Sequence, residues 1–207
     1  MTASAQGLER LRGFGSATVY EVAGEVTPLD PAIRALSAAD RVAGPAFTVR
    51  CARRDNLAIH RAVAEAPAGS VLVVDAGGDA AGYWGEILTV AAMARGIAGL
   101  VIDGGVRDTA PIAERGFPVW SRNVGIARCV KVDPGEVGGI VTVGGVKVAT
   151  GDIVVADADG VVAIPSDSLG EVLVAAEQRA VREAELFERL RAGELTIDLL
   201  GLRERLP

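Results

Sequence analysis

The sequence predicts an α/β protein with a mixed sheet, and two observations lead to this fold class. Up to residue 121, segments with a helical period alternate with short apolar runs that are typical of buried strands. From residue 140 the pattern changes to glycine-turned hairpins, followed by one long amphipathic helix. A chain of 207 residues suits a single domain over residues 1–207. Its core is expected to consist mainly of Val, Ala, Leu and Ile, because only 4% of the residues are aromatic.

Helices are expected where apolar residues recur every three or four positions, and strands where apolar runs lie between turn residues. The expected helices are 4–12, a short one beginning near Ser16 or Thr18, 56–65, one from Glu86 to just before Gly96, 109–115 and 167–191. The expected strands are 44–51, 70–75, 98–102, 118–121, 140–143, 146–149, 152–157 and 161–164, and residues 129–132 also have strand character.

Two details of the N-terminal helices depend on single polar residues. Thr18 and Glu21 have the spacing of a capping box, whereas Ser16 is an alternative first residue of the second helix, and the sequence leaves both open. Asp55 is positioned to act as the N-cap of the next helix. That helix contains His60, the only histidine of the chain, which is expected to be structural or exposed.

Composition argues against several classes of function. The net charge of −6 argues against non-specific nucleic-acid binding, which needs a basic surface. Cys51 and Cys129 are too few for a disulfide framework and are not spaced as a metal site, so buried reduced thiols are expected. The N-terminal residues lack the regions of a signal peptide, and no apolar run is long enough to cross a membrane. A cytoplasmic protein that binds neither membranes nor nucleic acid is therefore expected.

The segment from residue 82 to residue 108 contains the charged residues best suited to bind a small anion. The first amides of the helix beginning at Glu86 have no intrahelical acceptor and lie at the positive end of the helix dipole, so they form a carboxylate site. Gly85 precedes them without a Cβ that would block an anion. Arg107 offers a planar set of donors for a carboxylate or carbonyl oxygen, and Asp108 offers a hard oxygen ligand for a divalent cation.

The same residues resemble those of the class II pyruvate aldolases. The shared motifs are Gly85-Glu86-Ile87-Leu88, the Arg107-Asp108 pair that ends residues 103–108, and the glycine-rich segment 143–165. The likeness, over residues 15–190, is to the 4-hydroxy-4-methyl-2-oxoglutarate aldolases (HMG/CHA aldolases) of the RraA-like superfamily. It implies the α-β-β-α sandwich of the RraA-like swivelling fold.

The resemblance also implies an activity. This is a divalent-metal-dependent lyase that releases pyruvate from 4-hydroxy-4-methyl-2-oxoglutarate or related 2-oxo acids by a retro-aldol reaction, with oxaloacetate decarboxylase activity. It further implies assembly into trimers or hexamers. The apolar residues 197–202 agree with an oligomer, because they would be more stable on a neighbouring subunit than in water.

The residue roles follow from the same resemblance. Asp108 is implied to hold the metal, Mg²⁺ or Mn²⁺, and Arg107 is implied to contact the C2 oxygen of the substrate. Glu86 stands where these aldolases have aspartate and is expected to relay a proton. The residues implied to bind the substrate carboxylate are Gly85, Glu86, Ile87 and Leu88.

A competing interpretation is a non-catalytic binding protein, because RraA itself has this fold and regulates RNase E by binding it. Asp108 discriminates between the two interpretations. Regulators of that type can have a non-ligand residue after the arginine, whereas a metal-binding carboxylate is present here. The sequence therefore favours the enzyme.

Overall fold

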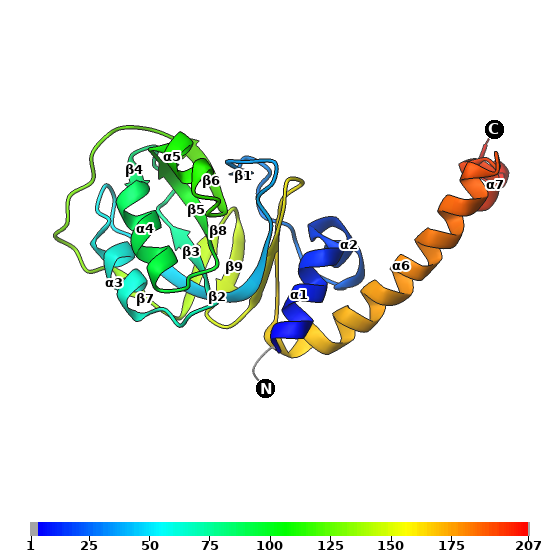
Figure 1. Cartoon of the computed structure of the whole chain (residues 1–207), viewed down its shortest axis with the longest axis horizontal. Helices are drawn as coiled ribbons and strands as arrows, with labels where there is room; N and C mark the ends of the chain where they lie inside the picture. Colours follow the sequence, from blue (N-terminus) through cyan, green and yellow to red (C-terminus); the bar gives the residue numbers. More distant parts are fainter. Residues whose placement is uncertain (1–3, 207) are drawn as a thin grey trace.

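The computed structural model describes residues 4–206, arranged in four layers that run from helices through two sheets to helices (Figure 1). Three buried apolar clusters fill the interfaces between these layers. One strand serves two clusters because its side chains alternate between the faces of the sheet. On β3 (Val71–Asp75), for example, Leu72 belongs to the first cluster and Val73 to the second. The predicted α-β-β-α sandwich is confirmed.

Three helices cover one outer face of the sandwich, and three others cover the opposite outer face (Figure 1). The first group is α3 (Leu57–Glu65), α4 (Glu86–Ala94) and α5 (Thr109–Glu114). The second group is α1 (Ala5–Phe14), α2 (Ser16–Val22) and α6 (Leu169–Arg191), and a short α7 (Thr196–Leu199) follows.

One continuous mixed sheet supplies both sheet layers, with the strand order β1-β6-β5-β3-β2-β10-β11, and β4 and β7 pair with β5 and β2. Besides β3, its strands are β1 (Arg34–Ala35), β2 (Val42–Arg50), β4 (Gly82–Trp84), β5 (Gly99–Val106), β6 (Val119–Val124), β7 (Glu136–Val137), β10 (Ile153–Ala156) and β11 (Val161–Ile164). A separate hairpin is formed by β8 (Ile140–Val143) and β9 (Val146–Ala149). Gly144 and Gly145 have positive φ in its turn, as the sequence predicts.

Strand β2 joins the two sheets of the sandwich. Residues 42–45 pair antiparallel with β10, and residues 46–50 pair in parallel with β3. Gly44 lies next to this changeover, where a Cβ would be 2.7 Å from the carbonyl oxygen of Gly69. The sheets therefore share one strand and curl around the central apolar cluster.

Strand β5 is longer than the sequence predicts. A strand ending at residue 102 and a polar turn over residues 103–108 are expected, but β5 continues to Val106, so this prediction is wrong. Gly104 and Gly105 lie within the sheet, where a Cβ on Gly105 would overlap the carbonyl oxygen of Ala81. Gly105 allows two backbones to approach closely and Gly104 makes room for the side chain of Ala76, so these glycines do not form a turn.

Helix α2 begins at Ser16, one of the two predicted starts. The amide and hydroxyl of Ser16 donate to the carboxylate of Asp157 at 2.7 and 2.6 Å, so the cap comes from a residue distant in the sequence. Burial alone would raise the pKa of Asp157, but the hydrogen bonds from Ser16 hold it below its usual value. The predicted strand at 129–132 is wrong, because within the described chain this segment forms only an isolated bridge at Val130.

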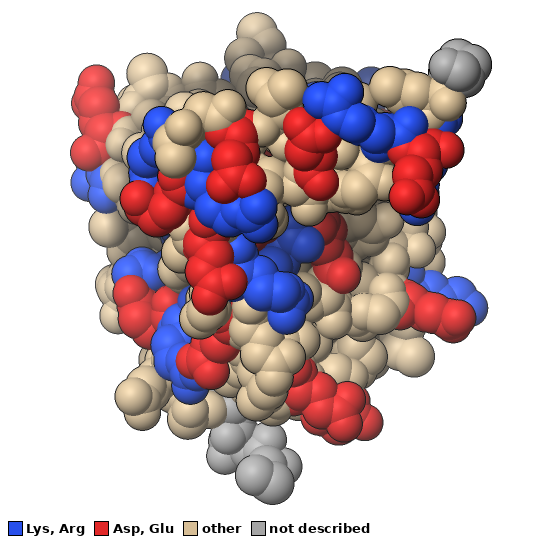
Figure 2. Space-filling model, turned by 90° about the vertical axis from the view of Figure 1, so that its right-hand side faces the viewer, with Lys and Arg blue, Asp and Glu red and all other residues tan. Residues whose placement is uncertain are grey.

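Helix α6 projects from the body of the protein, and α7 lies at its far end (Figure 1). Val172 and Ala176 near its start are buried, whereas Val181 and Phe187 farther along are 61% and 51% exposed. Figure 2 views this end of the molecule, where acidic and basic side chains are interspersed. Of the helices within residues 4–206, none has the length and apolar character needed to span a membrane.

Candidate active site

Pairing between β4 and β5 brings the two charged turns of the sequence together. Trp84 lies opposite Val106 in this parallel pair, and the Arg107 amide donates to the Trp84 carbonyl oxygen at 2.9 Å. Gly85 follows β4 directly, and Arg107 and Asp108 follow β5. The structure therefore places these predicted site residues side by side, at one edge of the sheet.

Buried polar and aromatic contacts fix the start of α4. The indole nitrogen of Trp84 donates to Thr89 Oγ1 at 2.7 Å, and Thr89 Oγ1 donates to the Gly85 carbonyl oxygen at 3.2 Å. The Trp84 ring also stacks on Phe117 with a centroid separation of 5.8 Å. The backbone that presents the first helical amides is thereby held rigidly.

The side chain of Arg107 lies against two glycines. A Cβ on Gly82 would lie 3.2 Å from Arg107 Cδ, and a Cβ on Gly85 would lie 3.1 Å from Arg107 Nε. The sequence predicts that the space beside Gly85 admits an anion. The structure corrects this, because Arg107 and Asp108 already fill that space.

Asp108 adopts a left-handed backbone conformation, with φ of 56°, directly before α5. Among residues with a Cβ, aspartate and asparagine tolerate this conformation best. Asp108 Oδ2 accepts a hydrogen bond from the Glu86 amide at 3.1 Å and lies 3.6 Å from Arg107 Nε. One of the helix-start amides expected to bind a substrate is therefore engaged by Asp108 itself.

Glu86 forms an ion pair that the sequence does not predict. Its Oε1 accepts hydrogen bonds from Arg115 Nη2 at 2.5 Å and from Arg115 Nε at 3.0 Å. Arg115 follows α5, so the pair links the first turn of α4 to the end of the neighbouring helix. Any proton transfer by Glu86 takes place beside this guanidinium.

Two adjoining cavities lie beside Arg107. The smaller, of about 90 Å³, reaches Gly85, Ile87 and Leu88, and the larger, of about 350 Å³, reaches Arg128. Ile87 is 78% exposed and Leu88 is 5% exposed, so Leu88 anchors the helix while Ile87 borders the opening. Four residues line both cavities: Asn56, Gly82, Arg107 and Lys131.

Three of the cavity residues, Asn56, His60 and Lys131, are not predicted by the sequence. His60 is expected to be structural or exposed, yet it lines the smaller cavity. Burial lowers the pKa of His60 and the nearby charge of Lys131 lowers it further, so the imidazole is neutral at pH 7. Their position in the cavity cannot be predicted from a periodic pattern or a motif. The start of α3 and an irregular loop, which are distant in the sequence, bring these side chains together.

Asp55 holds that loop in place. Its Oδ2 accepts hydrogen bonds from the amides of Val132 and Asp133, both at 2.8 Å, and its Oδ1 accepts one from the Leu57 amide at 2.9 Å. Burial alone would raise the pKa of Asp55, but these amides lower it. The predicted N-cap is therefore wrong by one residue, because Asn56 is the N-cap of α3; Asp55 precedes it and still accepts from the first amide of the helix while it anchors the loop.

The cysteines do not add a nucleophile to the site. Cys129 lines the larger cavity, and both cysteines are free and half-buried. Burial raises the pKa of Cys129, and it raises the pKa of Cys51 to about 12. Both thiols are therefore protonated at neutral pH, in agreement with the expected reduced state.

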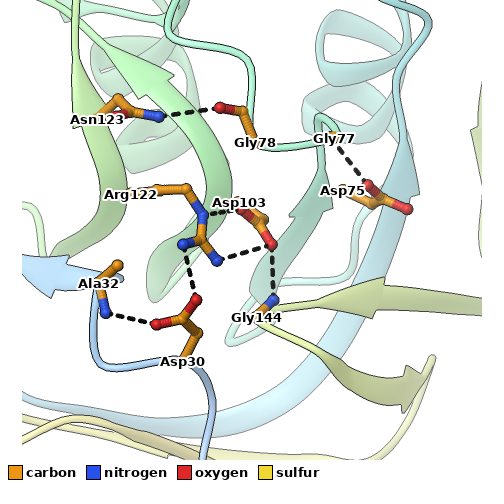
Figure 3. A network of polar contacts seen from close by, with 9 residues as sticks. All are labelled: Asp30, Ala32, Asp75, Gly77, Gly78, Asp103, Arg122, Asn123 and Gly144. Carbon is orange, nitrogen blue, oxygen red and sulfur yellow. Dashed lines mark hydrogen bonds and ion pairs between the residues drawn. The ribbon is translucent and has the colours of Figure 1, made fainter.

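A second polar cluster near the ends of β5 and β6 is structural (Figure 3). Arg122 forms an ion pair with Asp103 and a 2.8 Å pair with Asp30, and Asp103 also accepts a hydrogen bond from the Gly144 amide at 2.7 Å. These contacts tie two loops to the sheet. Asp79 is likewise a turn residue, as predicted, since its Oδ1 accepts a hydrogen bond from the Ala81 amide at 2.8 Å.

Asp108 fits a hard divalent cation. Within residues 4–206, no group of three or more His, Cys, Asp or Glu side chains is arranged to hold a metal. Both contacts of the Asp108 carboxylate described above are made by Oδ2, and the side chain is partly exposed. A cation held by one protein carboxylate, with water in the other positions, matches the preference of Mg²⁺.

Sequence comparisons place the chain in a known family. A family model described as RraA-like, Aldolase/RraA, matches residues 16–163. A protein of Halalkalibacterium halodurans, provisionally named 4-hydroxy-4-methyl-2-oxoglutarate aldolase, is 35% identical over 173 residues. The match covers 83% of this chain and 82% of that protein.

Solved structures share the fold. An uncharacterized protein from Pseudomonas syringae pv. tomato superposes with a TM-score of 0.84 at 25% identity, over 94% of this chain and 92% of the other. The RNA-processing inhibitor RraA from Thermus thermophilis superposes with a TM-score of 0.67 at 30% identity, over 72% and 91%. With the family model matching most of its length, the chain is a member of the RraA-like family of aldolases and RraA proteins.

Proposed function

We propose that the protein is a divalent-metal-dependent lyase that cleaves 4-hydroxy-4-methyl-2-oxoglutarate, or a related 2-oxo acid, to release pyruvate. We include oxaloacetate decarboxylation in the same proposal. The observation that supports it most is that Arg107 lines a cavity next to the start of α4 and that the carboxylate of Asp108 lies 3.6 Å from its Nε. The provisional name of the H. halodurans relative supports the same class of enzyme.

Arg107 supplies the positive charge that this chemistry needs. Retro-aldol cleavage and β-decarboxylation both leave negative charge on the enolate oxygen of pyruvate. One well-placed donor at such an oxygen typically lowers the barrier by about 3–4 kcal/mol. Arg107 binds the C2 oxygen in this proposal, and the substrate carboxylate lies on the amides of Ile87 and Leu88, because Asp108 already accepts from the Glu86 amide.

Asp108 would hold the cation, Mg²⁺ or Mn²⁺. When bound, such an ion supplies further positive charge to the developing enolate. The amide of Glu86 and the guanidinium of Arg107 orient Asp108 Oδ2. The first turn of α4 thereby positions the metal ligand as well as the substrate.

Glu86 is the proposed proton relay for the C4 hydroxyl of an aldol substrate. It lies in the first turn of α4, and its carboxylate is partly exposed. The ion pair with Arg115 keeps the side chain in one orientation. A general acid or base of this kind contributes about 10²–10⁴-fold to the rate.

The direct test is pyruvate release from oxaloacetate and from 4-hydroxy-4-methyl-2-oxoglutarate, each with added Mg²⁺ and each after chelation. We expect turnover of at least one substrate with Mg²⁺ and none after chelation. Asp108→Ala, purified in the same way, is the matched control for contaminating lyases. Equal activity in the variant and the wild type would contradict the proposal.

The alternative function is non-catalytic binding to an RNA-processing enzyme such as RNase E. It is favoured by one observation, the similarity to the RNA-processing inhibitor from T. thermophilis. Absence of lyase activity under all these conditions, together with direct binding to RNase E, would support this alternative. The carboxylate of Asp108 next to Arg107 favours the lyase.

A further inference from the structure

We propose that His60 transfers the proton at C3 of the bound 2-oxo acid, a step that no residue assigned above performs. This inference rests on the proposed function. There Arg107 acts on the C2 oxygen and Glu86 acts on the C4 hydroxyl of an aldol substrate. The enolate that remains after bond cleavage must still gain a proton at C3 to become pyruvate, and His60 is the only histidine of the chain.

His60 and Arg107 line the same small cavity, of about 90 Å³, beside the first turn of α4. This space is smaller than an ordinary small-molecule site, about 300–1,000 Å³, so it accommodates only the reactive end of a ligand. C3 is bonded directly to C2. A ligand whose C2 oxygen contacts Arg107 therefore places C3 within reach of the side chains that line this cavity.

Among the described residues that line this cavity, His60 is the one that can accept a proton. Arg107 and Lys131 carry positive charge and cannot accept one. The Tyr83 hydroxyl is fully buried and accepts a hydrogen bond from the Arg54 amide at 2.6 Å, and burial raises its pKa. No Asp or Glu is among these lining residues. Proton transfer inside the cavity therefore falls to the imidazole.

The first turn of α3 holds His60 at the cavity wall. Asn56 and His60 are four residues apart, which places them on one side of this turn, and both line the cavity. Asn56 Nδ2 donates to the Tyr83 carbonyl oxygen at 2.8 Å and so fixes the turn against β4. The His60 amide donates to the Asn56 carbonyl oxygen at 3.3 Å. The backbone that presents the imidazole is therefore well anchored.

The surroundings of His60 keep the imidazole neutral until an enolate forms. Burial lowers the pKa of His60, and the charge of Lys131 lowers it further. Arg107 adds a second positive charge to the lining of the same cavity. Neutral imidazole can accept a C3 proton from pyruvate. A negative enolate in the cavity has the opposite effect and raises the pKa of the ring, so the ring then takes up a proton from water.

The proton transfer balances in both directions. In cleavage the C3–C4 bond breaks and its electron pair forms the enolate. Imidazolium then gives its ring proton to C3, which leaves pyruvate and neutral imidazole. The ring takes that proton from solvent, and Glu86 returns the C4 hydroxyl proton to solvent, so retro-aldol cleavage consumes no net proton. In the reverse direction neutral His60 removes a C3 proton from pyruvate, and the imidazolium exchanges this proton with water.

Exchange of the C3 protons of pyruvate for deuterium tests the assignment without aldol turnover. Proton NMR follows the methyl signal in D₂O with Mg²⁺ for the wild type, His60→Gln and Arg61→Gln. We expect His60→Gln to exchange at least about 100-fold more slowly, because a general base contributes about 10²–10⁴-fold. Arg61→Gln is the control and should exchange at the wild-type rate, since the Arg61 side chain is exposed and pairs with Glu65. Equal rates in His60→Gln and the wild type, or no exchange by the wild type, overturn the proposal.

Two measurements on the wild type do not depend on the folding of a variant. A nuclear Overhauser effect between the imidazole ring protons and the methyl protons of pyruvate would show contact, and a single histidine makes the ring signals unambiguous. The exchange rate should also fall as the pH falls through the pKa of His60, measured by NMR titration of the same ring, because imidazolium cannot accept a proton. Absence of the Overhauser effect, or an exchange rate that does not follow the ring titration, overturns the proposal.

Pyruvate release separates this inference from the proposed function. Exchange that depends on His60, without cleavage of any tested 2-oxo acid, overturns the lyase and supports proton transfer at C3. Cleavage by the wild type, together with equal exchange in the wild type and His60→Gln, overturns the His60 assignment alone.

Discussion

The backbone of Gly85 packs directly against the carboxylate of Asp108, so that a Cβ on residue 85 would lie 2.5 Å from Asp108 Oδ2. Real Cβ atoms do not approach an oxygen so closely, and a side chain at this position would displace the carboxylate. The glycine therefore has a defined role, which is to let the carboxylate of Asp108 reach the amide of Glu86.

Gly85→Ala should lower pyruvate release by about 100-fold, because a displacement of roughly 1 Å of a catalytic group has an effect of that size. Gly170→Ala is the control, since Gly170 lies in α6, where a Cβ would meet no neighbouring atom within 4 Å. Circular dichroism and thermal unfolding check that both variants fold. Near-wild-type turnover by Gly85→Ala would show that the position of Asp108 is unimportant.

Arg107→Lys should lower kcat by about 100-fold while the protein stays folded. Lysine retains the charge but loses the planar set of donors that a developing enolate oxygen requires. Steady-state kinetics on each 2-oxo acid measure the effect. Arg95→Lys at the end of α4 provides the control, because within residues 4–206 the one side-chain hydrogen bond of Arg95 is to the exposed carbonyl oxygen of Ala64. A lysine variant that turns over every substrate at the wild-type rate would remove Arg107 from the mechanism.

Asp108→Asn should be nearly inactive at any accessible concentration of Mg²⁺ or Mn²⁺. Asparagine tolerates the left-handed backbone at this position and can still accept from the Glu86 amide, so the change removes mainly the negative charge. Chelation of the wild type should abolish activity, and either cation should restore it. Activity that survives both chelation and Asp108→Ala would indicate a metal-free mechanism.

Glu86→Gln should lower kcat by at least about 100-fold if Glu86 transfers a proton. Arg115→Gln breaks the same ion pair from the other side and should have a much smaller effect. Glu86→Asp, which introduces the residue of the aldolases that the sequence resembles, should retain most of the activity. Equal losses in Glu86→Gln and Arg115→Gln would reduce Glu86 to a partner of Arg115.

The projecting helix α6 should be covered by another copy of the chain, in a trimer or hexamer. Its exposed Val181 and Phe187 otherwise remain in water. Light scattering at micromolar protein should give a multiple of 21.2 kDa. Phe187→Glu should shift the protein toward smaller species, whereas Ile140→Glu, at an exposed apolar position on β8, should not. A fully active monomer would contradict this prediction.

Local signals explain which parts of the fold are predictable from the sequence. The helix before Gly96 is confirmed because Gly96, directly after the C-cap residue Arg95, has the positive φ that the pattern requires. The hairpin around Gly144 and Gly145 is confirmed for the same reason. The end of β5 is not predictable, because Gly105 is needed for a close contact with the backbone of Ala80 and Ala81, just before β4, that local sequence does not reveal.

In the candidate site, too, the residues with local sequence signals are predictable and those positioned by long-range contacts are not. Gly85, Arg107 and Asp108 lie next to predicted element ends, and their proximity follows from the pairing of β4 with β5. Asn56 and Lys131 depend on long-range hydrogen bonds between the start of α3 and an irregular loop. Their place in the cavity could not be predicted, because neither residue belongs to a motif or a periodic pattern.

The sharing of β2 between two sheets sets the order in which the chain can fold during synthesis. Residues 42–45 have no antiparallel partner until residues 153–156 have left the ribosome, and pairing over such sequence separation is slow. Until then this edge remains open to pairing with other chains. Helices α1 and α2 pack on β10, β11 and α6, so they too must wait. The first helices to be synthesised are therefore among the last to be buried.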